Sequence, residues 1–207
     1  MASTGAAVKP ERAAGSARAG TPMILETIVS TVDREGRPNF APMGITLEDG
    51  RVLLRPFRTA VTWKNLQEVG QGVVNFTDNV LLFARCAVTA FAPPHRNARQ
   101  VRAGVLEDAC YWKEFVVESQ ELGDDRGRFL GRVVEEGRAR DFVGFNRAKH
   151  AVIEATILAT RLHLLGRERV LEEIGRLRPL VDKTAGADER EAFDLLAEHA
   201  RGWRDAR

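Results

Sequence analysis

The sequence predicts an α+β fold, mainly β, in which an antiparallel barrel is followed by a C-terminal helical extension. Residues 23–138 hold short apolar runs, rich in β-branched residues and separated by tight turns, which is typical of strands. From residue 146 onward, apolar residues recur with helical spacing instead. We therefore divide the chain into an N-terminal tail (1–22), a barrel domain (23–144) and a helical extension (145–207).

The barrel domain is expected to open with three strands in a meander. Residues 23–32, 37–47 and 51–56 read as the strands, and residues 33–36 and 48–50 read as the turns between them. Turn residues at this spacing are typical of small antiparallel barrels.

The middle of the chain alternates helices with strands. We expect helices over 59–69 and 79–89, and strands over 72–77 and within 105–138, the last interrupted by a turn at 123–127. Thr59 and Asp78 are the expected N-caps of the two helices, because their side-chain oxygens can accept from free backbone N–H groups. Gly70 is the expected stop of the first helix.

The C-terminal extension is expected to be a helical hairpin or small bundle. Residues 146–165 contain no helix breaker, which predicts one helix about 30 Å long that ends at Gly166. Amphipathic patterns over 168–177 and 189–201 predict two further helices.

Charge and composition exclude several function classes. The net charge is only +2, and Lys9, Arg12 and Arg18 against Glu11 in the tail account for all of it, so the rest implies no basic face for nucleic acid. The tail's Ala, Gly, Ser and Arg content fits a disordered segment, or a transit peptide. No apolar run approaches the roughly 18 residues of a membrane span. Two cysteines form no disulfide framework, which favours a reducing cytoplasm.

Several catalytic and metal motifs are absent. The run G-Q-G-V-V-N has two glycines of a dinucleotide fingerprint, but it leads into a strand rather than out of one. His150 and His163 fall on separate faces of the predicted long helix, and the cysteines lack ligand spacing, so no metal site is expected. No side chain stands out as a catalytic acid, base or nucleophile.

The segment R-P-F-R-T-A-V-T predicts an anion site. Arg55 ends a strand, Arg58 and Thr59 follow at the start of a helix, and Thr62 lies within its first turn. A helix N-terminus with two guanidiniums and hydroxyls nearby suits a phosphate monoester. The same residues also fit an ordinary capped helix with solvated arginines. Phe57, between the arginines, is one of few aromatic residues that can stack on a ring.

Two strand segments also have unusual composition. Ala41, Pro42, Met43 and Gly44 are too small or too irregular for an ordinary strand, and they expose backbone against which a flat ring can lie. An edge strand or a bulge without a ligand explains them equally well. Asn75 and Thr77 share one side of the strand 72–77, and they face either a ligand or solvent.

Taken together, these segments resemble the flavin-reductase type of FMN-binding split barrel. The matching motifs are N-F-A-P at 39–42, T-W-K-N-L at 62–66 and V-V-N at 73–75; Gly44 departs from the usual Ser. The runs E-T-I-V-S-T-V, L-R-P-F-R-T and F-N-R-A-K-H-A-V-I-E make the chain similar to domain-of-unknown-function family 447 over about residues 23 to 180. That family is described as flavin-reductase-like and FMN-binding, with a helical C-terminal extension.

The resemblance implies a fold, a cofactor and a partner. It implies an antiparallel split barrel of the FMN-binding type, FMN as cofactor, and a homodimer with FMN near the subunit interface. It also implies an oxidoreductase, with a nicotinamide cofactor as a possible redox partner and a hint of one-carbon metabolism that uses tetrahydromethanopterin-type carriers. A flavin carrier or sensor without turnover, or a non-flavin interaction module, remains the alternative.

The residues above have expected roles in a site of this kind. Arg55, Arg58, Thr59 and Thr62 are expected to hold the phosphate, and the backbone of 41–44 to contact the ring, with Asn75 and Thr77 supporting it. Asn146, Arg147 and Lys149, at the start of the long helix, are candidates to close over the flavin or its phosphate; the alternative is that this helix only carries a solvated polar stripe, made of Arg147, His150, Glu154 and Arg161. Glu26 is expected to pair with an arginine of the long helix, because a buried carboxylate needs a partner.

Overall fold

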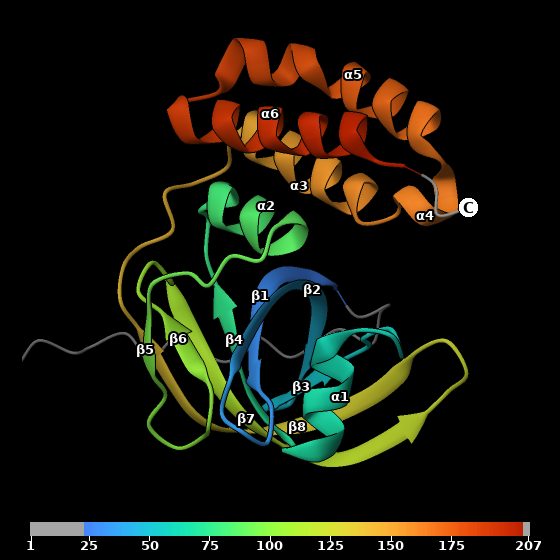
Figure 1. Cartoon of the computed structure of the whole chain (residues 1–207). Coiled ribbons are helices and arrows are strands. Elements are labelled where there is room, and N and C mark those ends of the chain that lie inside the picture. Colours follow the sequence, from blue (N-terminus) through green and yellow to red (C-terminus); the bar gives the residue numbers. More distant parts are fainter. Residues whose placement is uncertain (1–22, 205–207) are drawn as a thin grey trace, which may run out of the picture.

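A computed structural model describes residues 23–204, and the N-terminal tail (1–22) lies outside the described residues. Figure 1 shows two layers, with a β-barrel below and a layer of helices above it. The order of the elements confirms the predicted antiparallel barrel followed by helices.

Six antiparallel strands close the barrel in the order β1-β2-β3-β8-β7-β4. They are β1 (Leu25–Val32), β2 (Pro38–Glu48), β3 (Arg51–Leu54), β4 (Gln71–Phe76), β7 (Tyr111–Leu122) and β8 (Gly127–Arg138). A separate two-stranded sheet pairs β5 (His95–Asn97) with β6 (Gly104–Leu106). Sequence reasoning missed β5, because three polar residues carry no strand pattern.

The first two hairpins turn where the sequence predicts. Gly36 adopts a φ of +85°, and Asp49 and Gly50 adopt φ angles of +42° and +76°. Left-handed conformations of this kind are accessible to Gly and tolerated by Asp, so the two turns follow directly from local chemistry.

Six helices complete the described fold. They are α1 (Val61–Glu68), α2 (Val80–Val88), α3 (Arg147–Ala159), α4 (Leu162–Leu165), α5 (Arg167–Thr184) and α6 (Ala187–Gly202). The predicted N-caps are wrong. Ala60 precedes α1 and gives no side-chain cap, whereas Asn79 caps α2 by accepting from the Leu82 N–H at 3.1 Å.

The predicted single helix over 146–165 is also wrong, because it breaks between α3 and α4. The Thr160 hydroxyl donates to the Ile157 carbonyl at 2.9 Å, and Arg161 leaves the helical region at φ −109° and ψ +15°. A threonine that bonds back to the preceding turn competes with the helical ladder. In contrast, α5 runs past its predicted end because Val181 continues the buried face of Val170 and Ile174.

Each layer has its own apolar core. Inside the barrel, Phe115 and Phe129 are fully buried. Gly131 leaves room for the Phe115 ring, because a Cβ at position 131 would lie only 2.6 Å from that ring. In the helical layer, four small or branched residues of α3 form a continuous buried face, namely Ala148, Ala151, Val152 and Ala155. Ile28 of β1 and Phe83 of α2 join the two layers in a smaller cluster.

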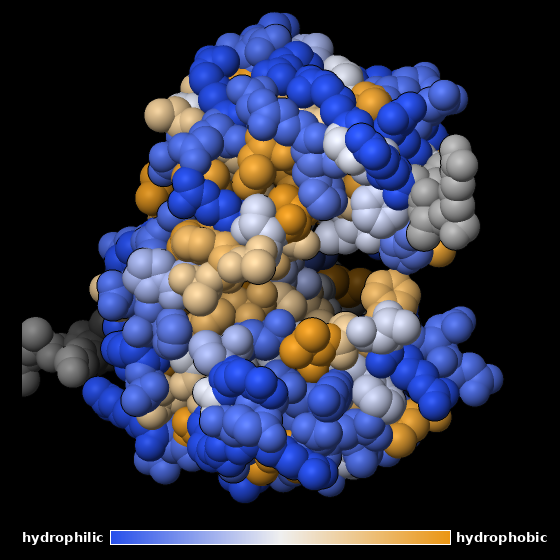
Figure 2. Space-filling model, viewed as in Figure 1, coloured by the Kyte–Doolittle hydropathy of each residue, from blue (hydrophilic) through white to orange (hydrophobic). Residues whose placement is uncertain are grey.

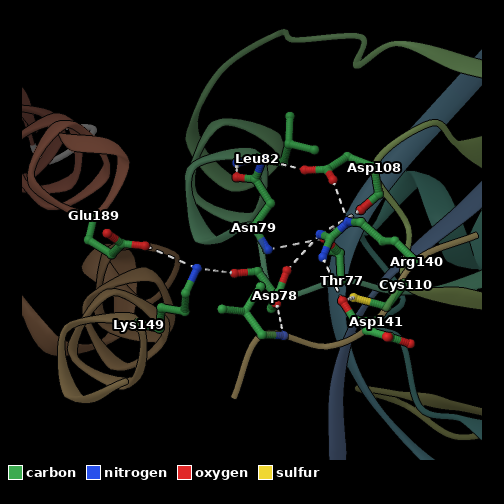
Figure 3. Close-up of polar contacts among 11 residues, drawn as sticks. Thr77, Asp78, Asn79, Leu82, Asp108, Cys110, Arg140, Asp141, Lys149 and Glu189 are labelled. Atoms are coloured by element: carbon green, nitrogen blue, oxygen red, sulfur yellow. Dashed lines mark hydrogen bonds and ion pairs between the residues drawn. The ribbon is translucent and has the colours of Figure 1, made fainter. Parts of the chain in front are cut away.

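A polar network around Arg140 also joins the layers (Figure 3). The Arg140 guanidinium pairs with Asp78 at 2.6 Å and with Asp108 at 2.7 Å. The Asp78 side chain is only 4% exposed, and its other oxygen accepts from the Val143 N–H at 2.8 Å. A carboxylate this deeply buried is stable only when it is paired.

The network continues into the helical layer through Lys149 of α3. Its ammonium donates to the Asp78 carbonyl at 2.6 Å and pairs with Glu189 of α6 at 3.0 Å. Burial alone would raise the pKa of Asp78 and that of Glu189. Hydrogen bonds from Arg140 to Asp78 and from Lys149 to Glu189 outweigh this and hold both pKa values below their ordinary range.

We expect Arg140→Ala to lower the free energy of unfolding by about 3 kcal/mol, because it leaves Asp78 buried without its partner. The matched control is Arg138→Ala, two residues earlier, whose exposed ion pair with Asp141 should contribute less than about 1 kcal/mol. Urea unfolding followed by circular dichroism measures both. Equal losses in the two variants would contradict the structural role of Arg140.

The lowered pKa values also predict a pH dependence of stability. Asp78 and Glu189 bind protons more readily in the unfolded chain than in the folded one. Their contribution to the free energy of unfolding is therefore complete above their unfolded pKa values, ordinarily 3.8 and 4.5. It is lost as the pH falls through the lower folded values. Urea unfolding between pH 7 and pH 3 should show this acid loss. Glu189→Gln should make the decline shallower, and Glu198→Gln, an exposed control on the same helix, should leave it unchanged.

Candidate functional site

Strand β2 has one edge without a strand partner. It pairs with β1 from Pro38 to Ile45, but its pairing with β3 begins only at Ile45. Among residues 23–204, therefore, no strand covers the other edge of β2 between Pro38 and Gly44, and we call this stretch the open edge. It contains Ala41, Pro42, Met43 and Gly44, all of which are half-buried. Backbone groups at such an edge are available to a ligand.

The segment 55–62 frames the open edge, and we call it the rim segment. Its start is fixed because Leu54, the residue before it, pairs with Ile45 at one end of the open edge. Its end is fixed because the Asn39 amide donates to the Thr62 hydroxyl at 3.1 Å, at the other end of the open edge. The chain between these two points therefore runs beside residues 40–44.

A small polar cluster holds α1 against the barrel at this point. Asn39 donates to Thr62, and Asn65 donates from its amide to the Thr31 hydroxyl at 3.0 Å. Thr31, Thr62 and Asn65 are each at most 1% exposed. Sequence reasoning quoted Asn39 and Asn65 within motifs but gave them no role, because only the fold brings them to Thr31 and Thr62.

Free cations lie on the rim segment. Arg55, Arg58 and Thr59 are exposed, and within the part of the chain that the structure describes neither guanidinium forms an ion pair. The first turn of α1 has no side-chain cap, so the N–H groups of Val61 and Thr62 remain available to an anion, whereas that of Trp63 donates to the Ala60 carbonyl at 3.1 Å. Phe57 is less free, because the Arg126 guanidinium lies over its ring at 3.7 Å.

Glu26 lies on β1, across the paired edge of β2, and its carboxyl lies beside Gly44, the last residue of the open edge. Withdrawal from water raises the pKa of its carboxyl, the charge of Glu154 on α3 raises it further, and Arg161 between α3 and α4 opposes the shift. The expected pairing of Glu26 with an arginine of the long helix is wrong, because Glu26 is exposed and forms no ion pair within the described residues; Arg161, which follows α3, acts on it only through its charge. Figure 2 shows a notch between the helical layer and the barrel, on the side where Figure 1 places α4 above β2 and α1.

Four other predicted site residues have polar partners within the fold. Asn75 is fully buried: its amide donates to the Ile28 carbonyl and the Ser30 hydroxyl, and its oxygen accepts from the Leu106 N–H. Thr77 donates to the Asp108 carbonyl beside Arg140. Asn146 caps α3 and donates to the Thr184 carbonyl, and Lys149 belongs to the Arg140 network. The structure does not bring these four to the open edge.

The described residues show no metal centre and no membrane span. No three His, Cys, Asp or Glu side chains within 23–204 are arranged to hold a metal ion. In the same range, no helix has the length and apolarity needed to cross a membrane.

Comparisons with solved structures identify similar folds. An FMN-bound protein from Methanosarcina mazei is 28% identical over 86% of this chain and 96% of that chain, with a TM-score of 0.76. An FMN-binding protein from Thermus thermophilus is 20% identical over 63% and 80%, with a TM-score of 0.49. A 2-nitrobenzoate 2-nitroreductase from Pseudomonas fluorescens is 19% identical over 58% and 67%, also with a TM-score of 0.49. No curated protein matches the chain.

Family models cover both layers of the fold. The model described as the N-terminal domain of a protein of unknown function (DUF447) matches residues 25–140, which include all strands of the barrel. The corresponding C-terminal model matches residues 146–198, which include most of the helical layer. The chain therefore belongs to the DUF447 family.

Proposed function

We propose that this chain is an FMN-binding flavoprotein and that the open edge of β2 is where it receives the flavin ring. The observation that carries the proposal is the pairing of β2, which leaves residues 38–44 without a second strand and sets the rim segment beside them. The FMN-bound relative from Methanosarcina mazei, which covers most of both chains, supports the choice of ligand.

The residues at the open edge fit the two ends of FMN. Arg55, Arg58 and Thr59 are exposed and unpaired among the described residues, so they can hold a phosphate beside the uncapped start of α1. The backbone of Ala41 to Gly44 offers N–H and C=O groups to the ring. Thr62 takes a positioning role in this proposal, because its buried hydroxyl already accepts from Asn39 and fixes the start of α1.

We further propose that the chain works as an oxidoreductase. When bound, FMN carries a hydride at N5 of its ring, so the protein needs to supply only binding, orientation and exclusion of water. This fits a site in which arginines and backbone groups predominate. The competing function is a flavin carrier or sensor that binds FMN in the same place without turnover.

The assembly and location of the protein are also proposals. We propose a cytoplasmic homodimer that accepts electrons from a nicotinamide cofactor. Support for a second copy comes from the linker between the layers, where three large apolar side chains are exposed, namely Phe142, Val143 and Phe145 at 52%, 82% and 90%. Exposed apolar groups clustered in this way are typical of interaction surfaces. A link to one-carbon metabolism stays a prediction.

The phosphate assignment predicts a selective loss in the double variant Arg55→Gln/Arg58→Gln. Each charge-assisted contact contributes about 1.5–3 kcal/mol, so the Kd for FMN should rise at least about tenfold. Riboflavin lacks the phosphate, and its Kd should stay the same. Quenching of flavin fluorescence measures both affinities. Arg51→Gln, an exposed control on β3 that pairs with Glu118, should bind FMN as the wild type does. Equal losses for FMN and riboflavin would contradict the phosphate assignment.

The oxidoreductase proposal predicts that NADH or NADPH reduces the bound flavin. Anaerobic addition of either to the FMN-loaded protein should bleach the absorbance near 450 nm faster than it bleaches free FMN at the same concentration. Absorbance that persists with both donors would show that neither reduces the flavin, and it would favour the flavin carrier or sensor over the oxidoreductase. Failure to bind FMN at all would instead remove both functions.

A further inference from the structure

The Glu26 side chain occupies part of the space beside Gly44. They lie opposite each other in the β1–β2 pairing, and their outward sides share one patch of the barrel. A Cβ at position 44 would lie 2.7 Å from Cγ2 of Ile24 and 3.3 Å from Oε1 of Glu26, both closer than side chains normally approach. The space that a side chain at position 44 would use is therefore already taken, in part by the Glu26 carboxyl.

The Glu26 carboxyl has no partner of its own in the fold. It is exposed, and within residues 23–204 it forms neither a hydrogen bond nor an ion pair. The charged groups that act on it come from the helical layer, namely Glu154 on α3 and Arg161 at the junction of α3 and α4. The carboxyl thus lies beside Gly44, at one end of the open edge, with both oxygens available to a ligand.

We propose that Glu26 is a ligand-binding residue that takes the place of a side chain at position 44 and accepts a hydrogen bond from the ring of the bound flavin. The inference rests on the proposed FMN site and adds a residue to it. The isoalloxazine ring carries one imide N–H, and an ionised carboxylate accepts from such a donor more strongly than a neutral group does. Gly44 is then the residue that leaves room for the carboxylate.

An ionised Glu26 should lower the stability of the ligand-free fold, and this effect can be measured. Partial withdrawal of the exposed Glu26 side chain from water, together with the charge of Glu154, raises its pKa above the ordinary value of 4.5, so the fold disfavours the ionised form. A raised folded pKa means that the group's stabilising contribution is present at low pH and is lost as the pH rises through the folded value. Glu26→Gln should therefore raise the melting temperature of the ligand-free protein at pH 7, while a ligand-binding role predicts weaker flavin binding.

The test compares Glu26→Ala and Glu26→Gln with the wild type. Kd values for riboflavin and FMN are measured by fluorescence quenching from pH 4 to pH 8, a window that begins below the ordinary pKa of a glutamate; riboflavin lacks the phosphate, which titrates near pH 6. Glu26→Ala should raise both Kd values about tenfold or more at pH 7. Wild-type riboflavin binding should weaken as the pH falls through the raised pKa, and Glu26→Gln should remove that dependence. Glu48→Gln, on β2, is the matched control and should behave as the wild type.

A substitution at Gly44 tests whether this position and Glu26 share the same space. Gly44→Ser should weaken binding because the added side chain meets Ile24 and Glu26. The double variant Glu26→Ala/Gly44→Ser should bind riboflavin more tightly than Gly44→Ser alone, because the contact with Glu26 is gone and only the exposed Ile24 side chain still has to move. Thermal melts show that each variant folds.

The outcomes separate the two proposals. Wild-type protein that binds neither flavin overturns the proposed function, and this inference with it. Wild-type protein that binds both flavins, together with a Glu26→Ala variant of unchanged Kd, overturns only the role of Glu26. Additive losses in the double variant would show that Glu26 and position 44 are not coupled.

Discussion

Unequal pairing of strand β2 is the constraint on which the site depends. One edge of β2 is paired from Pro38 to Ile45, whereas the other is paired only from Ile45 to Glu48, because β3 ends at Leu54 and the chain turns away. This leaves a short stretch of backbone uncovered inside an otherwise closed barrel. Pro42, which lacks an N–H, lies in the stretch and is tolerated only where a strand need not pair on both sides. The turn of the chain after Leu54 also carries the two free arginines past the same stretch.

The rest of the fold keeps this arrangement in place. The cluster of Asn39, Thr62, Thr31 and Asn65 fixes α1, and therefore the end of the rim segment, to the barrel. The Arg140 network and the apolar contacts of α2 fix the helical layer above the barrel, which brings Glu154 and Arg161 toward Glu26. The two polar connections bury groups that are mostly hydrogen-bonded, although the amide oxygen of Asn65 is buried without a partner, so they favour one placement of α1 and of the helical layer over others.

Local patterns predicted the strands and the first turns well, because alternation, β-branched residues and glycines act over a few residues. They failed where the role of a residue depends on a partner that is distant in the sequence. Asp78 looks like a helix cap, but Arg140, sixty-two residues later, takes its carboxylate, and Asn79 caps α2 instead. The break after α3 depends on one hydroxyl of Thr160, which periodicity does not register. The motif placed exposed arginines before α1 correctly, whereas the expected helix start at Thr59 was two residues early. That Asn75 and Lys149 are committed to internal contacts was not, because their partners come from other elements.

The central claim is that the open edge of β2 receives a flavin ring, and hydrogen–deuterium exchange tests it most directly. Exchange is measured by mass spectrometry on the full chain, with and without saturating FMN, for peptides that cover residues 38–45 and 55–62. The account predicts slower exchange in both peptides when FMN is bound, because backbone N–H groups there gain partners or lose access to water. Bound FMN that leaves both peptides unchanged and protects only residues 139–150 would contradict it.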